Sequence, residues 1–315
     1  MKLYPLSFAP VFAERVWGGH LLECFLGCEV EDEPIGEAWI ISNHKNGMSY
    51  VNHGEYKGKS LKELIDEFPE ELLGKEIYNK YGKNFPLLVK YIYAKDSLSV
   101  QVHPNDEYAL KNEGEPGKTE MWYILDAEEE ATLIAGLKKG VTKEIFAKEL
   151  ATGDPARLLS AKEVTRGDSI FIPSGRVHAI QAGLLILEIQ QSSDTTYRMF
   201  DWNRVGLDGK PRELHVEKSL ETTDWQDFEP DVKSVNDPNP ILAECEYFKI
   251  EKLMLDGTTD LLTEGAFVIL NAAEGNFTID GTDEVTEGQS RLIPAVLNKI
   301  SIKGEKSTII VSRPK

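Results

Sequence analysis

The chain has 315 residues, enough for two domains with a sizeable core. Its composition, 41% hydrophobic and 28% charged, is ordinary for a globular protein, and no apolar run approaches the ~18 residues that a membrane-spanning helix needs. The formal net charge of −18 is not offset by a basic stripe. We therefore expect neither nucleic acid nor a membrane as a partner, and any anion site must be a local group of lysines and arginines.

The cysteines and the N-terminal residues indicate the cellular compartment in which the protein is expected. Cys24, Cys28 and Cys245 form a sparse, odd-numbered set, which argues against a disulfide framework and fits a reducing cytosol. The first residues, 1–5, lack the apolar segment and cleavage site of a signal peptide. The sequence therefore predicts a cytoplasmic protein.

The first hundred residues predict short strands followed by a helix. Residues 1–56 contain short apolar runs with turn residues between them. Ser60 and Glu63 form a capping box for a helix that Pro69 ends or kinks, with Gly74 as its C-cap. The apolar run Phe85–Ile92 predicts a buried strand.

Two strand-like segments then carry polar side chains. In Leu98–Pro104, Gln101 and His103 are two residues apart, so a strand would point both to one face. In Gly117–Leu125, Lys118 and Glu120 have the same spacing.

A third segment brings another histidine to a fixed position. Ser169–Ile172 predicts a strand, Pro173 and Gly175 predict a tight turn after it, and His178 opens the next strand. Two imidazoles, one carboxylate and one amide oxygen suit a borderline divalent ion, most often zinc. Because no thiolate is near, the pattern favours a catalytic metal site over a structural one. The predicted ligands are Gln101, His103, Glu120 and His178, although Gln101 could instead hydrogen-bond one of the other ligands without touching the metal.

The last third of the chain predicts a separate β domain. The proline- and aspartate-rich segment 227–240 has the composition of a linker, and residues 241–315 are nearly all strand-like. Gly288–Pro294 repeats the glycine, serine, isoleucine and proline positions of Gly167–Pro173, but no histidine follows it. We expect a catalytic metal-binding domain at 1–235, with covering helices, and a metal-free second domain at 236–315.

These motifs resemble known families. The spacing of Gly167, Pro173, Gly175 and His178 is that of the second cupin motif. The runs 190–204 and 209–215, together with residues 17–19, 35–39 and 100–104 and with Ser42, resemble type I mannose-6-phosphate isomerase in its short bacterial form. The resemblance covers roughly residues 1–220. One departure from the family pattern is Thr119, where the long forms usually carry proline, and it leaves the flanking lysine and glutamate in place. The resemblance implies a mainly β fold. We expect a cupin (jelly-roll) barrel with a small helical segment, followed by a degenerate, metal-free cupin-like barrel.

The resemblance also implies an activity. Type I enzymes interconvert mannose 6-phosphate and fructose 6-phosphate through an enediol, with one Zn²⁺ or other divalent metal per chain. The resemblance marks Arg198 and Lys118 as catalytic and substrate-binding residues and Ser99 as a phosphate contact. An always-charged guanidinium suits stabilisation of the enediolate, and an ammonium can hydrogen-bond sugar or carry a proton. The expected partner is a hexose 6-phosphate, and the expected assembly is a monomer or a homodimer.

Two other functions remain open from the residues alone. A metal-dependent cupin oxygenase would use a histidine-rich site with open positions for oxygen, and it needs no lysine or arginine beside the metal. A sugar-phosphate-binding protein could keep the fold without turnover. An assay for aldose–ketose conversion, oxygen uptake or binding alone separates the three.

Overall fold

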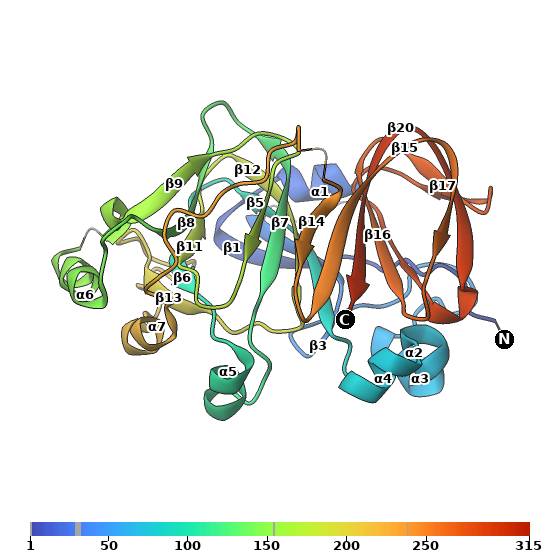
Figure 1. Ribbon diagram of the computed structural model, residues 1–315, viewed down its shortest axis with the longest axis horizontal. Coiled ribbons are helices and arrows are strands. Elements are labelled where there is room, and N and C mark those ends of the chain that lie inside the picture. Colours follow the sequence, from blue (N-terminus) through green and yellow to red (C-terminus); the bar gives the residue numbers. More distant parts are fainter. Residues whose placement is uncertain (1, 29–32, 154, 238) are drawn as a thin grey trace.

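The computed structural model describes residues 2–28, 33–153, 155–237 and 239–315. Figure 1 shows two β lobes side by side, the first running from blue to yellow and the second orange to red, with the N-terminus beside the second lobe. All pairs of named strands are antiparallel. The expectation of a mainly β fold is confirmed. None of the helices in the described ranges is both long and apolar enough to cross a membrane.

The first lobe consists of two facing sheets and a short hairpin. The six-stranded sheet has the order β1 (Val11–Gly19), β2 (Ile35–Ile41), β5 (Leu87–Ala94), β12 (Leu184–Gln191), β7 (Glu120–Ala127) and β10 (Ser169–Ile172). The five-stranded sheet has the order β13 (Tyr197–Phe200), β6 (Val100–Val102), β11 (His178–Ile180), β8 (Thr132–Leu137) and β9 (Leu159–Glu163). The hairpin pairs β3 (Asn43–His44) with β4 (Gly47–Met48).

The second lobe is built on one seven-stranded sheet that curls on itself. Its main path is β14 (Ile241–Glu244), β15 (Phe248–Leu262), β20 (Lys299–Pro314), β16 (Val268–Glu274) and β19 (Ser290–Ile293). Off this path, β17 (Phe277–Ile279) pairs with β20 and with β18 (Asp283–Val285). A 3₁₀ turn, η2 (Ala295–Leu297), follows β19.

Helices cover the outside of the two lobes (Figure 1). The Ser60 capping box is present and begins α2, and α2 ends before Pro69, as the sequence predicts. The chain then forms a second short helix, which begins at Pro69 and has Gly74 as its C-cap. Among the described residues the helical elements are α1 (Leu21–Leu26), α2 (Leu61–Glu67), α3 (Pro69–Leu73), α4 (Lys75–Tyr81), α5 (Asp106–Asn112), α6 (Lys143–Thr152), η1 (Pro155–Leu158) and α7 (Val216–Thr222).

Strand alternation decides which side chains face the interior of the first lobe. In β12, Leu185, Leu187 and Ile189 pack into the core that also contains residues of the second lobe. Leu184 and Ile186 point the other way, into the inner core of the first lobe. Because side chains alternate along a strand, Glu188 and Gln190 continue this inward face. The interior thus changes along β12 from apolar to polar.

The two lobes share a hydrophobic core. Leu6 forms a two-way backbone bridge with Leu292 of β19, both hydrogen bonds being 2.8 Å long. Leu6, Phe248 and Phe267 lie in the same core cluster as Tyr91 and other outward-facing residues of the first lobe. Contacts between the lobes are therefore close-packed and apolar, and folding of one lobe stabilises the other.

The prediction of a linker over 227–240 is wrong for its described part. Phe228 forms a parallel bridge with Leu137 of β8, and Lys233 pairs with Ser169 of β10. Asp227 also accepts two hydrogen bonds from Arg176, at 2.7 and 2.8 Å. Pro238 lies outside the described residues. Proline and aspartate suggested a free connection, but these side chains and backbone groups have fixed partners far along the chain.

Candidate metal and substrate site

Two histidines and a glutamate meet between the two sheets of the first lobe. His103 directly follows β6, Glu120 is the first residue of β7, and His178 is the first residue of β11. Their potential ligand atoms lie within 4.8 Å of one another, and all three side chains are buried. Nε2 of His103 is 3.6 Å from Oε2 of Glu120, and Nε2 of His178 is 3.4 Å from Oε1. Sequence reasoning thus named the three residues that the structure brings together.

Hydrogen bonds fix the tautomer of both imidazoles. Nδ1 of His103 donates to the carbonyl of Thr195, and Nδ1 of His178 donates to the carbonyl of Arg176, each at 2.9 Å. Burial lowers the pKa of His178 to about 3 and that of His103 well below its usual range. Both rings are therefore neutral, and each turns an Nε2 lone pair toward the common point.

Three polar atoms that face the centre of the triad are buried without a partner among the described residues. Both Nε2 atoms and Oε1 of Glu120 are buried, and none of the described residues hydrogen-bonds them. Leaving such atoms unsatisfied is costly, whereas a divalent cation would satisfy all three at once. The donor set, two imidazoles and a carboxylate, fits zinc or another borderline ion.

Gln101 lies beside the triad. In register, it pairs with His178 on one neighbouring strand and with Arg198 on the other. It is half-buried and lines the cavity described below. This position suits an amide oxygen ligand, and the assignment of Gln101 as a fourth ligand stays a prediction.

A row of alternating charges leads from the triad across the six-stranded sheet. Glu120 pairs with Lys118 at 2.9 Å, and Lys118 lies 3.7 Å from Glu188. Glu188 pairs with Lys90 at 3.0 Å, and Lys90 lies 3.7 Å from Glu37. Each of these charges is thus flanked by charges of the opposite sign, which offsets the cost of burying it.

Burial and neighbouring charges shift the pKa values in this row. Burial and the nearby Glu188 raise the pKa of Glu120 to about 7, with Lys118 acting against them. Burial acts in the same sense on Glu188, but Lys118 and Lys90 outweigh it and lower the pKa of that carboxyl. A dication bound at Glu120 would favour its ionised form and so reverse the first shift.

The importance of Lys90 and Glu188 was missed from the sequence. Lys90 is the only charged residue of β5, and Glu188 is the only charged residue of β12. A single charge within a run of apolar residues that is long enough to form a buried strand was the available signal, because such a charge requires a partner.

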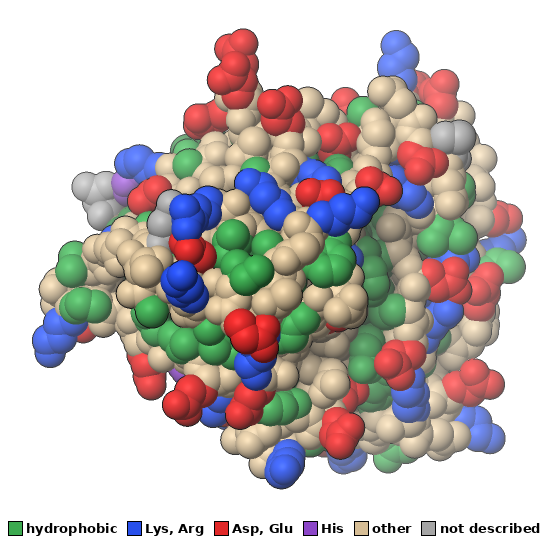
Figure 2. Space-filling model, turned by 60° about the vertical axis from the view of Figure 1, so that its left-hand side comes forward, with side chains coloured by type: hydrophobic (Ala, Val, Ile, Leu, Met, Phe, Trp, Pro, Cys, Tyr) green, Lys and Arg blue, Asp and Glu red, His purple; other side chains and the backbone are tan. Residues whose placement is uncertain are grey.

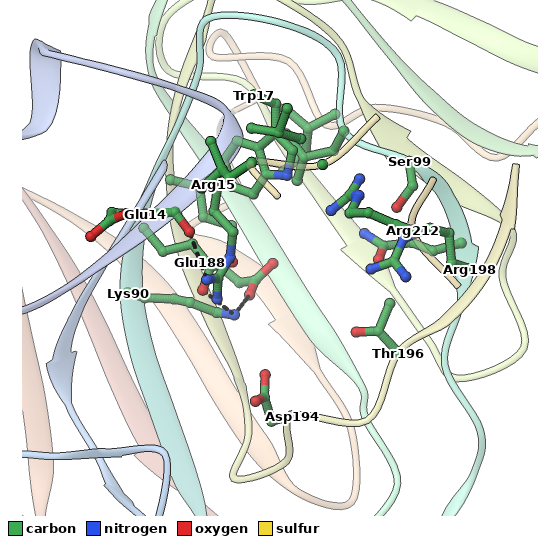
Figure 3. Close-up of a pocket in the computed structure, with 18 of the residues that line it drawn as sticks. Glu14, Arg15, Trp17, Lys90, Ser99, Glu188, Asp194, Thr196, Arg198 and Arg212 are labelled. Atoms are coloured by element: carbon green, nitrogen blue, oxygen red, sulfur yellow. Dashed lines mark hydrogen bonds and ion pairs between the residues drawn. The ribbon is translucent and has the colours of Figure 1, made fainter. Parts of the chain in front are cut away.

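The triad lies beside a cavity of about 630 Å³. Gln101 and Lys118, each close to the triad, are among its lining residues, as are Ser99 and Arg198. Figure 3 shows Lys90 and Glu188 on one side of it and Ser99, Arg198 and Arg212 on the other. The lining also includes Glu14, Arg15, Glu37, Asp194, Gly206 and Asp208.

No carboxylate in the described part of the chain forms a salt bridge with Arg198. Its Nη1 donates to the carbonyl of Glu213 at 2.8 Å, while its Nε is buried without a hydrogen bond. Burial lowers its pKa, and the neighbouring Arg212 and Arg204 add to this effect. A guanidinium held in this way can receive an anionic oxygen in the cavity.

Comparison with known proteins gives matches along almost the whole chain. The model of the type I phosphomannose isomerase catalytic domain matches residues 6–142, and that of the mannose-6-phosphate isomerase cupin domain matches residues 241–314. Mannose-6-phosphate isomerase ManA of Bacillus subtilis is 39% identical, over 98% of this chain and 99% of its own length.

Solved structures give the same picture. The crystal structure of the mannose 6-phosphate isomerase from Bacillus subtilis matches with a TM-score of 0.86 at 35% identity, covering 98% of this chain and 99% of that chain. A mannose 6-phosphate isomerase solved with zinc and yttrium shares the fold, with a TM-score of 0.76 at 16% identity over 99% of this chain and 100% of that chain.

Proposed function

Because this chain belongs to the type I mannose-6-phosphate isomerase family and is an enzyme of that family, we propose that it interconverts mannose 6-phosphate and fructose 6-phosphate at a divalent metal site. The observation that carries the proposal is the buried triad of His103, Glu120 and His178 beside a cavity that Lys118 and Arg198 line. We further propose one zinc ion per chain, held by the triad and by Gln101.

The reaction defines what the site must do. One proton leaves C2 of the aldose and one is added at C1, through an enediol, while the oxygens at C1 and C2 exchange carbonyl and hydroxyl character. Negative charge develops on these two oxygens in the transition state. The metal, when bound, would polarise these oxygens or orient the sugar.

Lys118 is assigned to proton transfer or to a hydrogen bond with the sugar. Its Nζ lies between Glu120 and Glu188, at 2.9 and 3.7 Å, so both carboxylates hold it at the edge of the cavity. Glu188 is also fixed by the indole Nε1 of Trp122, which donates to it at 2.7 Å. These contacts support a role in which Lys118 and a neighbouring carboxylate act as acid and base on the carbon chain of the sugar.

Arg198 is assigned to the charge that develops on the enediolate. It remains charged throughout, because its guanidinium does not lose its proton in proteins. Its fixed Nη1 and unpartnered Nε support a role in which the donors are in place before the charge appears. Ser99, buried on the same side of the cavity, is proposed to contact the phosphate.

A coupled assay tests the proposed reaction. Purified full-length protein is given mannose 6-phosphate, and fructose 6-phosphate formation and oxygen uptake are measured with and without a chelator. We expect isomerisation that the chelator abolishes and that added zinc restores. Oxygen uptake without isomerisation would instead indicate an oxygenase, and binding without turnover would indicate a non-catalytic protein. Either result would overturn the proposal.

A further inference from the structure

We propose that Asp106 and Gln191 are positioning residues for the reaction. Together they hold the backbone of residues 117–119, which carries Lys118 and leads directly into Glu120. The chemical roles of Lys118 and Glu120 rest on the proposed function, whereas the contacts that hold them are those of this chain. Asp106 is the first residue of α5, and Gln191 is the last residue of β12.

Asp106 holds the start of this segment. Its Oδ1 accepts a hydrogen bond from the amide of Gly117 at 2.8 Å. The two stretches of chain touch, because a Cβ on Gly117 would lie 2.5, 2.6 and 2.7 Å from backbone atoms of residues 104–106. Only glycine permits such a close approach. The next amide, that of Lys118, donates to the carbonyl of Pro104 at 3.1 Å. Pro104 directly follows a histidine of the triad, so the segment is tied to the chain beside it.

Gln191 holds the end of the segment by hydrogen bonds in both directions. The amide of Thr119 donates to Oε1 of Gln191 at 2.9 Å, and the amide of Gln191 donates to the carbonyl of Thr119 at 3.0 Å. Both residues are buried. Glu120 directly follows Thr119 and is the first residue of β7. The strand that carries the carboxylate of the triad therefore starts from a fixed point.

Asp106 determines which way the side-chain amide of Gln191 faces. Nε2 of Gln191 donates to Oδ1 of Asp106 at 3.0 Å. A carboxylate at neutral pH only accepts hydrogen bonds, so the amide nitrogen of Gln191 must face Asp106. The amide oxygen is then turned toward the backbone N–H of Thr119. Reversal of the amide would place two acceptors together and two donors together. Asp106 thus controls the contact with Thr119 through Gln191.

Threonine at position 119 makes this arrangement possible. Proline has no backbone N–H and could not donate to Gln191. The departure from the long forms, which usually carry proline here, therefore comes together with an acceptor for the additional donor. The side chain of Thr119 is used as well, because its Oγ1 accepts a hydrogen bond from the amide of Ser174 at 3.4 Å. Ser174 lies in the turn between β10 and His178, so the same residue also contacts the segment before the second histidine.

Asp106 and Gln191 act from outside the cavity proposed for the substrate. Among the described residues, the lining of the cavity beside the triad includes neither of them. Both line a separate cavity of about 550 Å³, together with Tyr247 of the second lobe. The hydroxyl of Tyr247 donates to Oδ2 of Asp106 at 3.0 Å, and so it leaves Oδ1 to the segment 117–119 and to Gln191. Any effect on the reaction must therefore pass through the backbone that the two side chains hold.

Small displacements of this segment affect two functional groups at once. Nζ of Lys118 lies 2.9 Å from Oε2 of Glu120, and the Oε atoms of Glu120 lie 3.6 and 3.4 Å from Nε2 of His103 and His178. A displacement of about 1 Å can cost about 100-fold in rate. Loss of a residue that orients a metal ligand typically costs about 10- to 100-fold in metal affinity or activity.

Asp106→Ala and Asp106→Asn test the positioning. Alanine removes both acceptor atoms. In asparagine the amide oxygen can still accept from Gly117 and Gln191, and the amide nitrogen can donate to the hydroxyl of Tyr247. In full-length, zinc-loaded protein, we expect Asp106→Ala to lower kcat about 10- to 100-fold and to speed zinc release to a chelator by a similar factor. Hydrogen exchange at the amides of residues 117–119 should also become faster. Asp106→Asn should stay within about threefold of wild type in all three measurements.

Two control variants separate positioning from charge and from the contact between the lobes. Glu107→Gln removes the neighbouring, exposed carboxylate of the same helical turn. Figure 2 shows lysines and arginines interspersed with acidic residues over one face of the molecule, so loss of one surface charge should change the field at the site little. Tyr247→Phe removes the hydroxyl at Oδ2 of Asp106 and leaves Oδ1 with both of its hydrogen bonds. Both controls should change kcat, zinc release and hydrogen exchange less than about threefold.

The comparison among these variants decides the proposal. If Asp106→Asn is as impaired as Asp106→Ala, the charge of Asp106 matters and its hydrogen bonds do not, which overturns the proposal. Equal losses in Tyr247→Phe and Asp106→Ala would assign the effect to the contact between the lobes and would also overturn it. Unchanged kcat, zinc release and hydrogen exchange in a folded Asp106→Ala protein would do the same.

A second variant and the two measurements without sugar keep the test independent of folding and of the proposed function. If Asp106→Ala does not fold, Gln191→Met replaces it, because methionine keeps the length of the side chain and removes the amide, and the same losses are expected. If the wild type does not isomerise mannose 6-phosphate, the proposed function fails. Zinc release and hydrogen exchange then still show whether Asp106 and Gln191 hold residues 117–119.

Discussion

The two lobes use the same local backbone arrangement with different contents. Gly167 and Gly288 both have positive φ, 91° and 83°, and each donates its amide to a carbonyl of a neighbouring strand, that of Ile124 or Ala272. Each glycine is followed by a four-residue strand and a proline, and β10 pairs with β7 as β19 pairs with β16. After Pro173 the chain turns to His178, whereas after Pro294 it enters η2.

The interiors differ more than the backbones do. The first lobe buries Lys90, Glu120 and Glu188 beside two neutral imidazoles. The inner core of the second lobe consists of aliphatic side chains and Phe277, and residues 241–315 contain no histidine. The comparison teaches that the glycine–strand–proline arrangement gives a strand and a turn in both lobes. The chemistry depends on which side chains the neighbouring strands turn inward.

The largest expected effect comes from removing the second lobe. Truncation after residue 240 would expose apolar side chains of the shared core that now pack on Phe248, Phe267 and Leu292. Each such buried side chain contributes about 1.5–3 kcal/mol, so the loss is comparable to the net stability of an ordinary domain. We expect insoluble or unfolded protein, measured by solubility and circular dichroism. A soluble truncated chain that binds metal but is inactive would place active-site residues in the second lobe.

His178→Ala breaks the metal site of the first lobe alone. Without one of its two imidazoles, the site should lose metal affinity by more than about 100-fold and isomerase activity with it. His53→Ala, at an exposed histidine, is the control and should keep both. Elemental analysis and the isomerase assay measure the effect. Full metal content in His178→Ala would contradict the assignment.

Arg198→Ala separates chemistry from folding within the first lobe. Loss of a preorganised donor to the developing charge should lower kcat by about 10²–10³, with a much smaller change in ground-state binding. Arg198→Lys should also be poor, and metal content and Tm should stay near wild type. Steady-state kinetics and thermal unfolding measure this. A large rise in KM with kcat intact would assign Arg198 to ground-state or phosphate binding, and a collapse of Tm would assign it to the fold.

Glu37 makes part of the stability of the first lobe pH-dependent. Burial alone would raise its pKa, but Lys90 and Arg15 outweigh it and hold the pKa at about 2. Because the folded-state pKa lies below the unfolded one, this contribution is complete above about pH 4.5 and is lost as the pH falls toward 2. Urea unfolding at several pH values should show a weaker acid dependence in Glu37→Gln than in wild type. If the free energy of unfolding depends on pH in the same way in the two proteins, the assignment to Glu37 is contradicted.

The smallest effect is expected from an ion pair of the second lobe. Arg291 pairs with Asp283 at 2.9 Å, and both side chains are largely buried. Arg291→Met should lower stability by about 1–2 kcal/mol and Tm by about 2–4 °C. Metal content and kcat should not change, because this pair belongs to the lobe without the triad. Altered kcat in a folded variant would connect the second lobe to the chemistry.

The sequence predicts those features that depend on neighbours along the chain. Glycine and proline mark the ends of β10, and the spacing of Gln101 and His103 follows from strand geometry, so both are predictable. The strand predicted from Gly117 begins only at Glu120, since the preceding residues are tied to the segment after β6 and to Gln191.

Features that depend on distant partners could not be predicted. Arg176 holds His178 through its carbonyl, and its own side chain is fixed by Asp227, which the composition placed in a linker. Lys90 and Glu188 lie on adjacent strands but far apart in sequence, so nothing local shows that they pair. The location of Arg212 likewise depends on Asp201.

The central claim is that the triad of the first lobe holds the one metal ion on which isomerisation depends. Reconstitution of the metal-free protein with measured amounts of zinc tests this claim most directly. Metal-free full-length protein is titrated with zinc, and bound metal and isomerase activity are measured in the same samples. Activity should rise linearly with bound zinc and reach its maximum at one ion per chain, and His178→Ala should show neither response. Full activity in protein that elemental analysis shows to be metal-free would contradict the account.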